Sequence, residues 1–215
     1  MATGISRRDF MVTTAATVAA GACTGKDTEA NAAAPKARAD LYHCEGCDAV
    51  FERDAKTLGW DVDIARGEPG EPMIAEGVVR AADGGAPVAG VIVYLHQTNA
   101  KGLYANGTSE TEWSRRHGRL RGWAVTDSQG RYRFRTIKPA PYPDMTMPAH
   151  IHLMVGEPGR RPYYIDDIVF DGEFKVDDAY RSRQEFRGGG GIVKLSKDAE
   201  GRWIARRDII LERHP

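Results

Sequence analysis

The sequence has no excess of either charge, no long hydrophobic run and few cysteines. Lysine plus arginine and aspartate plus glutamate each number 30, so the formal net charge is zero. A neutral chain lacks the basic surface with which proteins bind nucleic acid or anionic membranes. The apolar stretch at residues 11–22 is too short to cross a bilayer, which needs about 20 residues. We therefore expect no nucleic-acid partner and no transmembrane span.

The three cysteines restrict the choice of metal and redox chemistry. Cys44 and Cys47 form a Cys-Glu-Gly-Cys motif, and the chain has no second pair to complete a four-cysteine zinc site. A redox motif would lie between a strand and a helix, and neither is evident here. In an exported protein we expect a local disulfide between these two cysteines instead. The neighbouring His43 is expected to be a surface residue and not a ligand.

The N-terminus has the order of an export signal. Arg7 and Arg8 precede a modestly apolar stretch, rich in alanine and threonine, that ends in small residues. This order predicts a twin-arginine (Tat) signal and a periplasmic or extracellular location, against the alternative of a disordered tail that happens to contain two arginines. Cys23 follows an Ala-Gly-Ala sequence, which is a weak lipoprotein cleavage site. Simple cleavage and a lipid anchor at Cys23 both remain open.

Three segments are predicted along the chain. Residues 1–25 form the signal, residues 26–70 form a linker and a cysteine-containing arm, and residues 71–215 form a single domain. Residues 26–39 are rich in alanine and charged side chains and have no aromatic residue, so they are expected to be a flexible tether. The remaining chain is long enough to bury one sizeable core.

The domain is predicted to be all-β, a β-sandwich of mostly antiparallel strands. Short segments rich in valine, isoleucine and aromatic residues are separated by polar turns, and helical periodicity is weak outside the signal. Two hairpins are expected, one joining residues 122–126 to 131–137 and one joining residues 191–195 to 203–211. The strands are expected at residues 73–81, 88–97, 122–126, 131–137, 150–155, 163–170, 191–195 and 203–211.

The sequence His150-Ile151-His152 carries the most chemical information. Residues two apart in a strand point to the same face, so both imidazoles are directed to one side, while Ile151, Leu153 and Val155 face the other. Two such histidines supply half of a metal site, because neutral imidazole binds zinc, copper, iron and nickel. Taken alone, a His-x-His pair on a strand is more often packing or surface chemistry than a metal pair.

The residues around this pair resemble the intradiol ring-cleavage dioxygenases, the family of protocatechuate 3,4-dioxygenase and catechol 1,2-dioxygenase. Residues 148–152 match the family's Pro-Ala-His-Ile-His segment. Residues 97–104 are similar to its Asn-x-x-Gly-x-Tyr stretch, and residues 126–143 are very close to the protocatechuate branch. This resemblance covers residues 73–172 and implies four iron ligands, of which the tyrosines are also catalytic. The implied ligands are Tyr104, Tyr142, His150 and His152.

The chemistry of these donors agrees with Fe(III). Two phenolates and two imidazoles include no thiolate for copper(I) and no carboxylate cage for magnesium or calcium. A tyrosine of ordinary pKa binds as phenolate only where the charge of the metal removes its proton. Two phenolates, one hydroxide and Fe(III) together are neutral, which favours a site buried inside the sandwich. Singly, Tyr142 could be a buried turn aromatic and Tyr104 a loop anchor.

The resemblance implies an enzyme that uses O2 to cleave a catechol between its two hydroxylated carbons, giving a cis,cis-muconate-type diacid. The chain departs from the family at two positions: Met147 stands where an arginine is usual, and Asp167 aligns with a glutamine. A carboxylate close to a catecholate should oppose binding unless it is protonated or paired. Tyr142 and His150 are also closer in sequence than usual. The candidates for a compensating positive charge are Arg133, Arg135, Arg160 and Arg161.

Two alternatives follow from the same residues. One is a metal-free β-sandwich of the transthyretin or carboxypeptidase-regulatory type, supported by a strand-turn-strand unit at residues 77–90. The other is an iron-tyrosinate protein that acts on a different aromatic substrate. The substituents of the catechol and the oligomeric state are not predicted. His96, expected to face away from Val93 and Leu95, receives no role, and neither do His117 and His214.

Overall fold

The computed structural model describes residues 37–107 and 110–215. The expected signal at residues 1–25, the open question of Cys23 and most of the tether lie outside this range. Among the described residues, no helix has the length and apolar character needed to span a bilayer.

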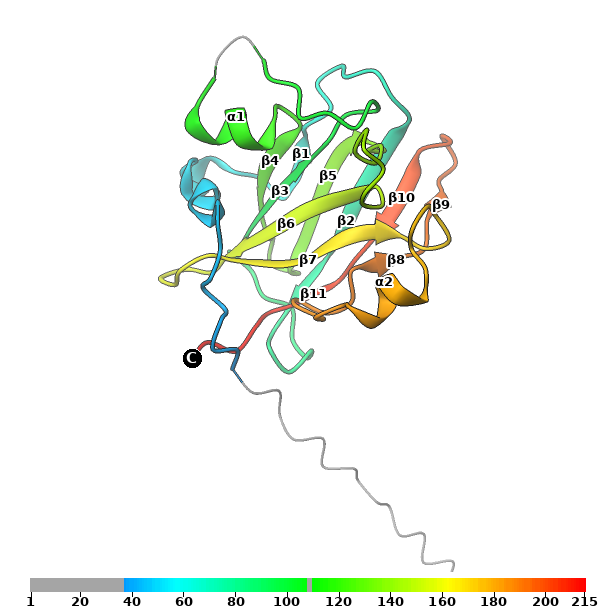
Figure 1. The fold of residues 1–215 in the computed structure, drawn as a ribbon. Helices are drawn as coiled ribbons and strands as arrows, with labels where there is room; N and C mark the ends of the chain where they lie inside the picture. Colours follow the sequence, from blue (N-terminus) through cyan, green and yellow to red (C-terminus); the bar gives the residue numbers. More distant parts are fainter. Residues whose placement is uncertain (1–36, 108–109) are drawn as a thin grey trace, which may run out of the picture. The chain divides into compact units, whose positions relative to one another are not determined.

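Two β-sheets pack face to face (Figure 1). Most neighbouring strands are antiparallel, but β1–β5, β2–β10, β2–β11 and β7–β8 are parallel. Sheet I has the order β1 (Asp61–Asp63), β5 (Arg131–Ile137), β2 (Pro72–Arg80), β10 (Trp203–Arg206) and β9 (Ser196–Lys197), with β11 (Ile209–Ile210) beside β2. Sheet II has the order β4 (Arg121–Val125), β3 (Ile92–Gln97), β6 (His150–Gly156), β7 (Tyr163–Phe170) and β8 (Ile192–Val193). The predicted all-β class is confirmed.

The described residues also form four short helical segments. These are α1 (Glu112–His117), α2 (Asp178–Ser182) and the 3-10 turns η1 (Cys47–Phe51) and η2 (Ala55–Thr57). None was predicted, because an amphipathic pattern needs more than the one or two turns that each contains. A capping box between Thr111 and Ser114 starts α1, in which each side chain bonds the backbone N–H of the other residue.

The main core lies between the sheets and follows the alternation of the strands. Leu95 of β3 and Ile151, Leu153 and Val155 of β6 are buried there against sheet I residues such as Phe134. Burying an aliphatic side chain of this size contributes about 1.5–3 kcal/mol. The inner face of β6 is therefore entirely apolar, as its sequence predicted.

The outer face of sheet II carries a second apolar cluster. Ile92, Tyr94, Trp123 and Met154 are buried there beneath the N-terminal arm, which we define as residues 41–58. The Trp123 indole N–H donates to the carbonyl of Ala49 in the arm at 2.8 Å. The arm also contains the disulfide between Cys44 and Cys47, as predicted.

The first predicted hairpin is wrong in its pairing, and the second is confirmed at its turn. Strand β4 pairs with β3 in sheet II, whereas β5 pairs with β2 in sheet I. The turn at 127–130 closes by a hydrogen bond from Gly130 N–H to the Asp127 carbonyl at 2.9 Å, but it leads the chain from one sheet to the other. The C-terminal hairpin turns at residues 198–201 and pairs β10 with β9, so its first strand is residues 196–197 and not 191–195, where β8 pairs with β7. Apolar alternation fixes which side of a strand is buried, but not the sheet to which the strand belongs.

Candidate metal centre

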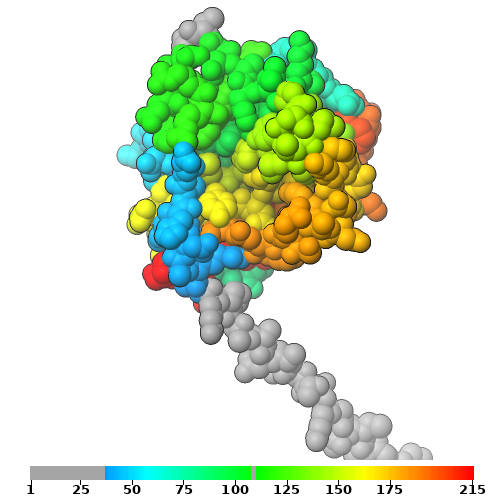
Figure 2. Space-filling view, in the orientation of Figure 1, coloured from blue at the N-terminus to red at the C-terminus, as the bar shows by residue number. Residues whose placement is uncertain are grey.

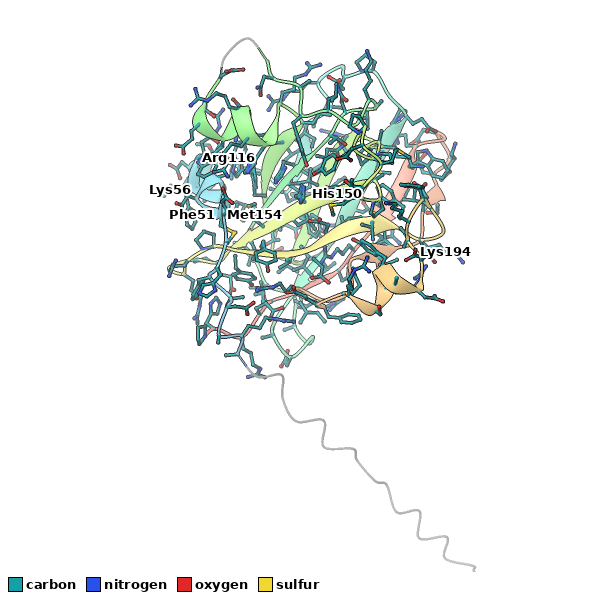
Figure 3. All side chains as sticks on the ribbon, viewed as in Figure 1. Phe51, Lys56, Arg116, His150, Met154 and Lys194 are labelled. Atoms are coloured by element: carbon teal, nitrogen blue, oxygen red, sulfur yellow. A yellow bond between two sulfur atoms is a disulfide. The ribbon has the colours of Figure 1, made fainter. Side chains whose placement is uncertain are left out.

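Four side chains converge on the outer face of sheet II, near the N-terminal end of β6. His150, labelled in Figure 3, comes from β6. His152 comes from the same strand, and Tyr142 comes from the loop between β5 and β6. Tyr104 lies in the loop between β3 and α1. The histidines lie opposite the apolar side chains of β6, as predicted, but the site is not buried inside the sandwich, because those apolar side chains fill the space between the sheets.

The loop that carries Tyr104 depends on a close backbone approach. Gly102 has a φ of +76°, and a Cβ at this position would lie 2.0 Å from the carbonyl oxygen of Pro141. Only glycine tolerates both conditions. The contact holds the loop of Tyr104 against the residue that precedes Tyr142, so the two tyrosines are brought to the same place.

The four predicted ligand atoms form a closed ring. The Tyr104 and Tyr142 hydroxyls lie 2.9 Å apart, and the Tyr142 hydroxyl lies 3.1 Å from His150 Nε2. His150 Nε2 is 3.1 Å from His152 Nε2, which lies 2.9 Å from the Tyr104 hydroxyl. Nitrogen and oxygen donors bound at right angles, about 2.0–2.2 Å from one ion, are separated by roughly 3 Å. The spacing of the ring therefore fits one shared metal ion.

The other ring nitrogens fix the direction of the histidine lone pairs. His150 Nδ1 lies 2.8 Å from the carbonyl oxygen of Pro148, which can only accept, so this nitrogen donates. His152 Nδ1 lies 2.9 Å from the carboxylate of Asp167 and donates in the same way. In the neutral imidazoles, both Nε2 atoms are then acceptors that face the ring, where the hydroxyls of Tyr142 and Tyr104 can donate to them. The same two lone pairs are free to bind a metal ion once the hydroxyl protons leave.

The titration of the four groups shows what a bound cation would have to change. Burial lowers the pKa of His150, and it raises the pKa of both tyrosines. Burial opposes protonation of His152 as well, but the Asp167 carboxylate outweighs it and raises the pKa of His152. Without a multivalent cation both tyrosines are neutral phenols at physiological pH. A trivalent ion in the ring would convert them to phenolates.

Asp167 reaches His152 because β7 contains a β-bulge. In the register with β6, Leu153 pairs with Ile165 and Ile151 pairs with Ile168, so two residues of β7 lie opposite one residue of β6. Both isoleucines face the core. The bulge thereby directs Asp167 toward the outer face. Its carboxylate is paired with His152, which is the condition under which a carboxylate near a substrate is tolerated.

The candidate compensating arginines are mostly engaged elsewhere. Arg133 forms an ion pair with Glu76 at 2.8 Å, and Arg135 lies 3.6 Å from the carboxylate of Asp61. Arg161 lies over the ring of Tyr42 at 5.0 Å. The hypothesis that these three residues replace the arginine absent at position 147 is therefore wrong.

Sequence reasoning missed two histidines behind the centre. His96 faces away from the core, as expected, but it is buried and stacks on His152 with ring centroids 4.4 Å apart. His117 stacks on His96 at 4.0 Å, and its Nδ1 lies 2.8 Å from the Tyr94 hydroxyl. Burial holds the pKa of His96 well below its ordinary value and lowers that of His117 to about 4. Alternation along β3, which places His96 on the same face as Tyr94, was the available signal.

Comparisons with known proteins identify a family and several relatives. The family described as Dioxygenase matches residues 53–186. The chain is 38% identical over 97 residues to the protocatechuate 3,4-dioxygenase beta chain of Burkholderia cepacia, covering 42% of this chain and 41% of the relative. It is 31% identical over 110 residues to catechol 1,2-dioxygenase 1 of Acinetobacter lwoffii, covering 50% of this chain and 34% of the relative.

A solved structure shows the same fold. The crystal structure of catechol 1,2-dioxygenase from Pseudomonas arvilla C-1 is 27% identical and superposes with a TM-score of 0.53, covering 72% of this chain and 56% of that chain. The chain thus spans well under two thirds of these relatives' lengths. Because the family match includes more than half of the sequence, the chain belongs to the intradiol dioxygenase family.

Proposed function

We propose that the protein is a non-haem Fe(III) dioxygenase that cleaves a catechol between its two hydroxylated carbons. The closed ring of two phenol oxygens and two imidazole nitrogens carries the proposal. Family membership supports it independently. Iron(III), when bound, would accept both oxygens of the catechol and make its ring reactive toward O2, so that the product is a cis,cis-muconate-type diacid.

The protein side chains have separate tasks in this proposal. His150 and His152 hold their Nε2 lone pairs toward the centre, because the Pro148 carbonyl and the Asp167 carboxylate engage their Nδ1 atoms. Burial raises the pKa of both Tyr104 and Tyr142, so each is a strong base once a bound Fe(III) has removed its proton. We assign the Tyr142 phenolate the removal of one proton from the incoming catechol, as the resemblance to the family implies. Tyr104 remains the fixed donor.

Metal analysis and an absorption spectrum of protein folded with iron test this assignment. We expect one iron per chain and a visible phenolate-to-iron charge-transfer band that is lost in Tyr104→Phe and Tyr142→Phe. Tyr42→Phe is the matched control, because Tyr42 bonds His214 outside the ring and its change should leave the band intact. O2 uptake and muconate formation are then measured with protocatechuate, catechol, hydroxyquinol and pyrogallol.

Each competing function has its own outcome. A colourless protein that retains no iron would support a metal-free binding or structural sandwich. A coloured protein that forms no muconate-type product from any of the four catechols would support an iron-tyrosinate protein with another aromatic substrate. Either result would contradict the proposed dioxygenase.

We also propose export by the Tat route to the periplasm or the cell exterior. The order of charged, apolar and small residues at residues 1–25 supports this. Replacing Arg7 and Arg8 by lysine should retain the full-length precursor in the cytoplasm, as measured by fractionation. Cys23→Ala should release the protein from membranes if Cys23 is lipidated, and should change nothing after simple cleavage.

A further inference from the structure

A pocket adjoins the metal centre on the side of the Tyr142 loop. Thr146, Met147 and Pro148 line one side, residues 175–183 line the other, and the cavity has a volume of about 380 Å³. The loop around residue 145 and the segment around residue 180 lie on the same face of the molecule in Figure 2. We call this the side pocket. Its volume lies within the range of small-molecule sites.

One contact and one electrostatic effect connect the side pocket to the centre. Pro148, which lines the pocket, supplies the carbonyl that holds His150. Tyr180, on the opposite side, is near enough to Asp167 for the carboxylate to add to the effect of burial and raise the pKa of the phenol. The pocket therefore begins two residues before His150, in the direction in which a substituent of a ring at the centre can extend.

Two positively charged side chains, Lys175 and Arg183, line the side pocket. Lys175 Nζ donates to the carbonyl of Thr146 at 3.2 Å, and neither Lys175 nor Arg183 forms an ion pair within residues 37–107 and 110–215. The one lining carboxylate, Asp177, accepts the Tyr180 backbone N–H at 2.8 Å as the cap of α2. Asp144 lies near enough to Lys175 for their charges to interact, which makes Arg183 the stronger candidate for binding an anion.

The remaining lining is mostly apolar. Met147, Pro148 and Ala179 present hydrocarbon or thioether surface, and Tyr180 presents a ring. Such a wall suits the carbon skeleton of a side chain, while the cations suit an anionic end group. A guanidinium binds a carboxylate through two parallel hydrogen bonds, whereas an ammonium acts as a point charge.

We propose that the side pocket binds a carboxylate substituent of the substrate, with Arg183 as the principal partner and Lys175 as the secondary one. The preferred substrate is then a catechol that carries an acidic side chain. This inference rests on the proposed function for the placement of the ring. Arg183 and Lys175 are specificity-determining residues and take no part in ring cleavage.

The test compares 3,4-dihydroxyphenylacetate with 4-methylcatechol, which lacks the carboxylate. Titration of the iron-loaded protein without O2 gives Kd from the visible band, and steady-state assays give KM and kcat. Arg183→Gln should raise Kd and KM for the acidic catechol about tenfold, and Lys175→Gln about threefold. Both variants should leave kcat unchanged, and should alter neutral-catechol binding less than twofold. Added salt should weaken only the acidic ligand.

Arg160→Gln is the matched control, because it removes the same charge from the turn between β6 and β7, at the far end of that hairpin from His150. It should change neither ligand. Arg183→Lys keeps the charge and should restore most of the binding, which excludes misfolding as the cause. Equal losses for both catechols, or no loss in Arg183→Gln, would overturn the assignment of the side pocket.

A second measurement separates this inference from the proposed function. Calorimetry of iron-free protein with 3,4-dihydroxyphenylacetate reports on the pocket without turnover. Binding that depends on Arg183, together with no cleavage of any catechol, would support the pocket and contradict the dioxygenase. Cleavage of 4-methylcatechol with no preference for the acidic ligand would contradict the pocket and leave the dioxygenase standing.

Discussion

The two faces of sheet II have different compositions and serve different purposes. On the inner face, β6 contributes Ile151, Leu153 and Val155 to a fully apolar core. On the outer face, the same strand contributes His150 and His152 to the metal centre. Because side chains alternate along a strand, a seven-residue strand supplies both the stability of the fold and its chemistry.

Buried polar side chains on the outer face of sheet II lower the stability of the fold. His96 Nδ1 is buried with no hydrogen-bond partner among the described residues, and an unsatisfied buried polar atom costs about 1–3 kcal/mol. No buried side chain of β6 on the inner face carries such a cost. The polar site therefore lowers stability on the outer face of sheet II, and the apolar packing of the inner face offsets this loss.

Substitution of two neighbouring residues of β6, one on each face of sheet II, should give the largest difference between the faces. Leu153→Ala should lower the free energy of unfolding by about 2–5 kcal/mol, because it leaves a cavity in the core. His152→Ala should abolish iron binding while changing the stability of the iron-free protein by less than about 1 kcal/mol. Urea unfolding and metal analysis of both variants give the two quantities. A His152→Ala protein as unstable as Leu153→Ala would contradict the division between the faces.

A smaller effect on metal binding is expected from Asp167, which contacts the ligand His152. Asp167→Asn keeps the shape of the side chain but removes the negative charge that polarises His152. Loss of such a partner typically weakens metal binding about 10–100-fold. Competition with a chelator measures this affinity, and the charge-transfer band should shift in energy. Asp198→Asn is the control, because Asp198 accepts from Arg202 in the turn between β9 and β10 of sheet I and should leave both readouts unchanged.

The sequence predicted which residues lie on each face of sheet II better than it predicted which residues they contact. Alternation assigned Leu153 to the core and His152 to the opposite side, and the spacing of Cys44 and Cys47 predicted their disulfide. The sequence did not reveal that His117 stacks on His96, which in turn stacks on His152, because this contact joins a helix to a strand. Such contacts depend on how separate elements pack, and local periodicity carries no information on that packing.

The bulge in β7 was readable in principle. Ile165 and Ile168 are three residues apart, so a regular strand would place them on opposite faces, yet both are buried. Two apolar residues at an odd spacing within a strand indicate an inserted residue. That signal would have placed Asp167 on the face of the histidines. The wrong hairpin has no comparable signal, because the turn at 127–130 has the same sequence pattern whether or not the chain changes sheets.

The disulfide of the N-terminal arm can be removed to measure how much this arm, which covers the apolar cluster of the outer face, contributes to stability. Replacing Cys44 and Cys47 by serine opens a four-residue loop, and loop-closure entropy gives a loss of up to about 2 kcal/mol. We expect lower stability in urea under oxidising conditions and no difference between variant and parent after reduction. A difference that persists in reducing buffer would show that the serines, and not the missing crosslink, cause the loss.

The smallest expected effect comes from the ion pair that ties the arm to β4. Arg121 Nη2 donates to Glu52 Oε1 at 3.1 Å, and this hydrogen bond holds the pKa of Glu52 below its ordinary value of 4.5. A lowered folded-state pKa contributes stability above the unfolded-state pKa, which is lost as the pH falls through the folded value. Glu52→Gln should therefore cost about 0.5–1 kcal/mol at pH 7, allowing for solvent screening of a partly exposed pair.

The same variant should match the parent once the pH lies below the folded-state pKa, because Glu52 is then neutral in both states of the parent. Thermal or urea unfolding between pH 7 and pH 3 measures the difference. Glu45→Gln is the control, because Glu45 pairs with Arg116 at the surface, where such pairs contribute little. A Glu52→Gln difference that does not change with pH would mean that packing of the arm, and not its charge, holds it on the outer face.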